Sequence, residues 1–130
     1  MNTMSEQAVF DEIAATQQHF SKAPLAFFRA WKSGVELAGH ELFGNGTREC
    51  LELAADKWDL RPNVAFIRKT IGAMSSGEKV FLAAMVSFYN ANDGGALLKR
   101  VGVNGLADLG GLDLERRRII ATLILNYTGW

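Results

Sequence analysis

The side chains best suited to chemistry in this sequence are two histidines, His19 and His40, and the one cysteine, Cys50. A cysteine beside a histidine can act as a nucleophile, and all three could bind a metal ion. Glu41 follows His40 as in the zinc motif His-Glu-x-x-His, but Gly44 stands where the second histidine belongs. Free cysteines are usually buried, so we interpret Cys50 as a structural residue and predict no metal site. Whether the three side chains converge in the fold stays open at this point.

Residues 72–80 come nearest to a phosphate-binding loop. Such a loop needs a lysine directly after its second glycine and then a serine or threonine that holds Mg²⁺. Here Glu78 separates Gly77 from Lys79, and Val80 replaces the hydroxyl residue. The carboxylate would repel a phosphate, whereas Ser75 and Glu78 have the spacing of a helix capping box. We therefore interpret this segment as a junction between two helices and predict no cofactor.

Glycine is concentrated between Gly94 and Gly111, where six of the thirteen glycines lie. A calcium loop that started at Asn90 would need an acid where Val101 stands, which disfavours calcium. Helix ends and tight corners are the favoured interpretation. The functional alternative is a mobile polar rim that grips a small ligand or a peptide beside an aromatic pocket. Its candidate residues are Asn92, Asp93, Asn104 and Asp108 for the rim, and Phe81, Phe88 and Tyr89 for the pocket.

Three consecutive arginines, Arg116, Arg117 and Arg118, fall near the expected start of the last helix. Cations there oppose the helix dipole, which favours anions. Asp113 and Glu115 stand at pairing distance from Arg117 and Arg118 and offer compensation. The functional alternative is a site for an anion, an acidic partner or DNA. Nucleic acid is a disfavoured partner, because the 14 bases and 14 acids leave no net charge.

Apolar residues recur at spacings of three and four, which predicts helices to position these side chains. The first is expected over about 5–20, with Thr3 and Glu6 as a capping box. Val9, Phe10, Ile13, Ala14 and Phe20 would fall roughly on one face of this helix. Further helices are expected from Pro24 to Ala38, after the cap Thr47 to about Trp58, from Pro62 to Met74, from Ser75 to a stop at Asn92–Gly95, over 96–101 ending at Gly102, and from the cap Asp113 to about Tyr127.

The last helix is apolar around most of its circumference, so we predict that it is the core helix or a dimer helix. Trp31 and Trp58 are expected in the core. Trp130 ends the chain, and we expect it to dock on the body or into a second copy, because a free terminus would fray.

The sequence of 130 residues, 48% of them hydrophobic, predicts a compact all-α fold: a single-domain bundle of five to seven helices. The first twenty residues lack the pattern of a secretory signal, and we expect a cytoplasmic protein without a membrane partner. A small protein-interaction or regulatory module (adaptor, inhibitor or immunity-type) without catalytic activity is the leading hypothesis, with another protein or a second copy as partner. The alternatives are a small-molecule-binding domain with a pocket near residues 81–108 and a DNA-binding regulator that uses Arg116–Arg118.

Overall fold

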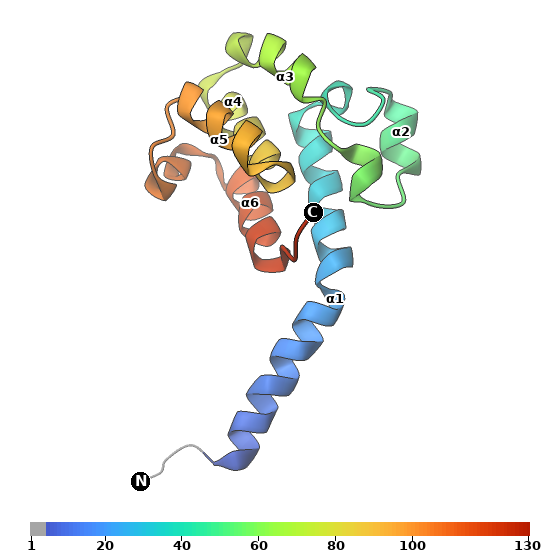
Figure 1. Cartoon of the computed structure of the whole chain (residues 1–130), viewed down its shortest axis with the longest axis vertical. Coiled ribbons are helices and arrows are strands. Elements are labelled where there is room, and N and C mark those ends of the chain that lie inside the picture. Colours follow the sequence, from blue (N-terminus) through green and yellow to red (C-terminus); the bar gives the residue numbers. More distant parts are fainter. Residues whose placement is uncertain (1–4) are drawn as a thin grey trace.

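The computed structural model describes residues 5–130, and within them the fold is all-α, as predicted (Figure 1). Six α-helices follow one another in this described part of the chain: α1 (Glu6–Ala38), α2 (Arg48–Leu53), α3 (Val64–Thr70), α4 (Ser76–Tyr89), α5 (Ala91–Arg100) and α6 (Leu114–Asn126). Short 3-10 helices connect them: η1 (His40–Leu42), η2 (Lys57–Leu60), η3 (Ile71–Ala73) and η4 (Leu106–Gly111).

The core is built around α4, in which the six consecutive residues from Phe81 to Val86 are buried. On one side α5 packs along α4, and on the other the second half of α1 contributes Phe27, Trp31 and Val35. The expectation that the last helix is central was wrong. α6 buries Ile120 and Leu123, but Ile124 and Leu125 on its other side are exposed. α6 is apolar around most of its circumference and is nevertheless not the most buried helix of the fold.

α1 is one continuous helix of 33 residues, where the sequence predicted two. Pro24 lies inside it and not at a helix start. Proline removes one backbone hydrogen bond from a helix. The carbonyl group four residues before Pro24 therefore has no backbone N–H to accept from. Because Pro24 is exposed, this carbonyl group can bond to water instead. Gly34 was expected to weaken this helix, but it is buried there, and a Cβ on it would lie 2.7 Å from the Met85 Cε atom.

α5 contradicts the stop predicted at Asn92–Gly95, because these residues form its first turns. The side chain of Asn90 caps the helix by accepting a hydrogen bond from the backbone N–H of Asp93 at 3.0 Å. Gly94 then faces α4 so closely that a Cβ on it would lie 2.1 Å from the Ser87 Cα atom. Glycine serves here for close helix packing and not for termination.

The locally encoded helix starts agree with prediction. Thr47 caps α2, Ser75 and Glu78 form a capping box on α4, and Asp113 caps α6. Pro62 does not open α3; it forms an antiparallel bridge with Phe43, and Asn63 caps the helix. Ser5 caps α1, whereas the expected cap Thr3 lies outside the described residues.

The first half of α1 extends away from the rest of the molecule (Figure 1). Every described residue up to Gln18 is exposed, and His19 is the first that is partly covered. We call residues 5–22 the arm and the remainder, 23–130, the body. Although α1 is long, the described part of the chain holds no helix apolar enough to cross a membrane.

Candidate interaction surface

One side of the arm carries four exposed large apolar side chains. Their exposed fractions are 41% for Val9, 64% for Phe10, 48% for Ile13 and 49% for Phe20. The spacings of three, four and seven residues place them on one helical face, together with Ala14, Thr16 and Gln17. We call this surface the arm face. The four side chains share one helical face, as the sequence predicted, and this face is exposed.

The arm face continues a stripe that is buried farther along the same helix. Phe27 lies seven residues after Phe20, and both Phe27 and Trp31 are covered by the body. The Phe27 ring lies 6.0 Å from that of Phe88 and 5.8 Å from that of Tyr127, measured between centroids. The body therefore covers the inner half of the stripe, and the outer half lies open.

From Val9 to Phe20 the arm face itself carries no charged side chain. By the 100° rotation per residue, Asp11 and Lys22 fall on the opposite side of the helix and Glu12 on its flank. Glu6 precedes the arm face, in the first turn of α1. A surface without charges and with small residues among its large ones can be approached closely by a second helix.

At the base of the arm, His19 joins α1 to the end of α6. Its Nε2 atom lies 2.9 Å from the carbonyl oxygen of Leu125. Around this contact, Leu125 and Tyr127 of the C-terminal segment are exposed apolar residues. The end of α6, with these exposed side chains, thus lies at the base of the arm.

A groove of about 480 Å³ lies between α4, α5, η4 and α6. Its walls include Phe88, Leu98, Leu109 and Ile120, and no charged side chain lines it. Of the predicted rim residues only Asn104 borders it, and the predicted Tyr89 does not. The groove falls close to the pocket expected from the sequence, with a different set of walls.

The glycine-rich segment forms two separate structures and not one polar rim. Asn92 and Asp93 belong to α5, where Asp93 Oδ1 accepts a hydrogen bond from Arg68 Nη2 at 2.7 Å. Asp108 caps η4 by accepting from the backbone N–H of Asn104 at 2.7 Å and of Gly105 at 3.2 Å. These two bonds stabilise the carboxylate and lower the pKa of Asp108.

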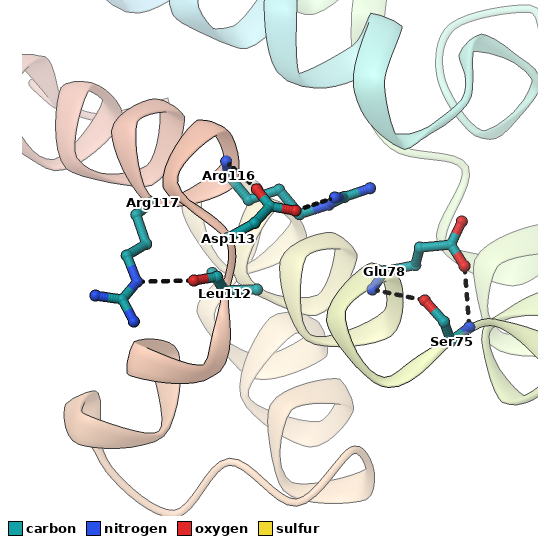
Figure 2. Close-up of polar contacts among 6 residues, drawn as sticks. All are labelled: Ser75, Glu78, Leu112, Asp113, Arg116 and Arg117. Carbon is teal, nitrogen blue, oxygen red and sulfur yellow. Dashed lines mark hydrogen bonds and ion pairs between the residues drawn. The ribbon is translucent and has the colours of Figure 1, made fainter.

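The three arginines do not gather into one cationic patch, and Figure 2 shows that the side chains of Arg116 and Arg117 point in different directions. Arg116 Nη1 lies 2.5 Å from Asp113 Oδ2, and its guanidinium lies 5.7 Å from the Phe81 ring centroid. Arg117 turns the other way and donates from Nε to the Leu112 carbonyl at 2.8 Å and from Nη2 to that of Gly110. Arg118 is exposed. Two of the three cations therefore stabilise the start of α6.

Asp113 is both the cap of α6 and the partner of Arg116 (Figure 2). The backbone N–H of Arg116 donates to it at 2.9 Å, and this bond, followed by the side-chain bond from Arg116, lowers the pKa of Asp113. In the neighbouring capping box, hydrogen bonds from Ser75 lower the pKa of Glu78. Asp113 thus compensates the charge of Arg116, whereas the sequence predicted it as the partner of Arg117, which instead bonds to carbonyl groups.

Trp130 packs back against the body, beside the middle of α1 (Figure 1). Its ring centroid lies 4.7 Å from that of Trp31, 5.2 Å from Tyr89 and 5.9 Å from Trp58. Lys57 fastens the tail, because its Nζ donates to the Gly129 carbonyl at 2.6 Å. Trp58 lies in η2, half-exposed, and not in the core as predicted. Tyr89 and Trp130 therefore pack against each other and against further aromatic residues of the same chain.

The two histidines and Cys50 have separate partners. His19 contacts Leu125, His40 lies 3.8 Å from a carboxylate oxygen of Glu41, and the Cys50 Sγ atom donates to the Asp59 carbonyl at 3.4 Å. Residues 5–130 include no group of three side chains that could hold a metal ion.

Comparison of the chain with protein-family models, with curated proteins and with solved structures finds no match in any of the three. The arm face is the surface that sequence reasoning did not identify as a candidate site. Its signal was the stripe that runs through Pro24 without a change of register, from Phe10 and Ile13 to Phe27 and Trp31. Such a stripe predicts one helix longer than a small body can cover.

Proposed function

We propose that this chain is a small cytoplasmic protein-interaction module without catalytic activity, and that it binds its partner through the arm face. The observation that carries the proposal is the exposure of Val9, Phe10, Ile13 and Phe20 on one side of a helix that projects from the body. Contiguous exposed apolar patches mark interaction sites more often than isolated apolar residues do.

A partner that covers the arm face would remove its four large apolar side chains from water, and this burial would stabilise the complex. Burial of apolar surface contributes roughly 25 cal/mol for each Å² removed from water. Phenylalanine is the largest side chain on the arm face, and Phe10 is also the most exposed of the four. Pairs of these side chains are separated by three, four and seven residues, the separations that amphipathic helices use when they dock on apolar surfaces.

Photo-crosslinking in the host cell tests this proposal. A photoreactive amino acid at Ile13 reports on the arm face, and the same residue at Ala15 reports on the opposite side of the same helical turn. We expect a discrete crosslinked protein species from position 13 and none from position 15. Equal labelling from both positions, or none from either, would overturn the assignment of the arm face.

A second candidate function is the binding of an apolar small molecule in the groove between α4, α5, η4 and α6. It is supported by the volume of about 480 Å³ and by walls without charge, which suit an uncharged ligand. Gly95 borders the groove, and a Cβ on it meets no atom within 4 Å. Gly95→Leu should therefore fill the groove without disturbing the fold.

Titration with the neutral dye Nile red, displaced by decanol, measures occupancy of this groove. The control is Ala96→Leu, the next residue of α5, which does not line the groove. Loss of decanol-sensitive fluorescence in Gly95→Leu alone supports this function. Identical titrations of the wild type and Gly95→Leu would contradict it.

A further inference from the structure

We propose that the occupant of the arm face is the arm of a second copy of this chain, and that the two arms pair antiparallel. This inference rests on the proposed function, since it names the partner of the same surface. Three features carry it: the distribution of charge along α1, the pattern of large and small residues on the arm face, and the apolar surface at the base of the arm.

The charges of α1 are separated along its length. Its first seven residues carry Glu6, Asp11 and Glu12, and no further acid occurs before Glu36. The bases Lys22, Arg29 and Lys32 all follow in that interval. In an antiparallel pair the acidic end of each arm lies level with the basic part of the other helix along the axis, with Asp11 and Lys22 on the outer sides of the pair. A parallel pair would place acid beside acid.

Because these charges are exposed to solvent, their effect is one of steering and orientation. Exposed charges interact over a Debye length of about 8 Å at physiological salt. Lys22 and Asp11 lie on the outer sides of a pair whose axes are about 8–10 Å apart, so these charges favour one orientation during approach and form no direct ion pair across the interface. Because the whole chain has no net charge, two copies approach without overall repulsion.

The arm face also suits a two-fold axis. Its aromatic residues, Phe10 and Phe20, lie near the two ends, and Ala14 and Thr16 lie between them. A two-fold rotation about an axis near residue 15 brings Phe10 of one copy next to Phe20 of the other, at both ends of the pair. Aromatic pairs of this kind are favourable, and the small central residues allow the helices to approach.

The base of the arm completes the interface. From Ser5 to Phe20 the arm spans about 24 Å at 1.5 Å per residue. In the antiparallel pair, the tip of each arm therefore reaches the other copy where Leu125 and Tyr127 are exposed.

Sedimentation of the purified full-length protein tests self-pairing. We expect the wild type to sediment at twice the chain mass of 14.3 kDa at micromolar concentration. Ile13→Glu places a carboxylate at the centre of the pair and should weaken association at least tenfold. Ala15→Glu introduces the same carboxylate on the opposite side of the helix and should leave the dimer intact. Both positions are exposed in the single chain, so neither variant should unfold the body.

Spin-label distances test the orientation. The labels are attached to Gln7→Cys or Gln18→Cys in a Cys50→Ser background, which removes the native thiol. In an antiparallel pair centred near residue 15, the two labels at position 18 lie about 9 Å apart along the axis, and those at position 7 about 24 Å. In a parallel pair in register, both separations along the axis would be close to zero.

Each outcome decides a different point. A wild type that stays monomeric at 100 µM, or a dimer that Ile13→Glu and Ala15→Glu weaken equally, overturns self-pairing. Short distances at both label positions overturn the antiparallel arrangement. If the protein is monomeric but position 13 still crosslinks to another protein in cells, the proposed function stands and this inference fails. If neither occurs, both fail.

Discussion

Gly94 of α5 lies directly against the backbone of Ser87 in α4. A Cβ on Gly94 would lie 2.1 Å from the Ser87 Cα atom and 2.4 Å from its nitrogen, both backbone atoms that no side-chain rotation can move aside. The residue next to Gly94 is in the opposite situation, because a Cβ on Gly95 meets no atom within 4 Å. Two adjacent glycines of α5 therefore have opposite structural roles.

Replacing these two glycines by alanine, one at a time, should change the free energy of unfolding in opposite directions. Gly94→Ala forces α4 and α5 apart, and overpacking of this kind costs about 1–3 kcal/mol or more. Gly95→Ala should stabilise the protein by about 0.5–1 kcal/mol, because alanine favours the helix over glycine and nothing obstructs it. Urea unfolding of the two variants measures both effects. Equal free energies of unfolding would show that the helices are not packed this closely.

The C-terminal tail should contribute to stability through its indole ring. Trp130→Ala removes the packing against Trp31, Tyr89 and Trp58, and we expect the free energy of unfolding to fall by about 2–4 kcal/mol for a partly buried aromatic residue. The indole Nε1 atom is buried without a hydrogen-bond partner, so Trp130→Phe gives up no such bond and should cost less. Thermal unfolding separates the two variants. An unchanged melting temperature in Trp130→Ala would contradict a docked tail.

Asp113 predicts a dependence of stability on pH. Its pKa is lowered in the folded chain by hydrogen bonds from Arg116, so its contribution is present above the ordinary value of 3.8 and is lost as the pH falls through the folded value. The variant Asp113→Asn keeps a side-chain oxygen that can cap α6, but it has no negative charge to pair with Arg116. The melting temperatures of the wild type and Asp113→Asn should differ most above about pH 5 and converge in stronger acid. A difference that stays constant with pH would contradict this role.

The parts of the fold that the sequence predicted are those encoded within one turn of chain. The caps at Thr47 and Asp113 and the capping box of Ser75 with Glu78 bond to residues three positions away. The errors arose where distant residues decide the outcome. Gly94 was interpreted as a stop, but its neighbour is α4, which no local pattern reveals.

The arm face was not identified as a candidate site for a related reason. An apolar face on a helix predicts burial, and the pattern does not distinguish burial by the chain's own body from burial by another molecule. Ile13 and Trp31 follow the same stripe, but only the second is covered. The sequence also left Arg116 and Arg117 as candidates for binding an anion. In the fold, the start of α6 brings Arg116 to its cap Asp113 and brings Arg117 to two carbonyl groups.

The independence of arm and body leads to the last prediction. Since every described residue before His19 is exposed, a chain that begins at residue 19 should keep the packing of the body and the His19 bond to Leu125. The proper reference is Ile13→Glu, because a dimer is stabilised by mass action and a monomer is not. We expect the truncated chain and Ile13→Glu to melt within about 2 °C of each other, because both are monomers with the same core. Hydrogen exchange should show the same protection in α4 for both. A truncated chain that melts much lower would mean that the arm folds back on the body, and the arm face would then have an intramolecular occupant.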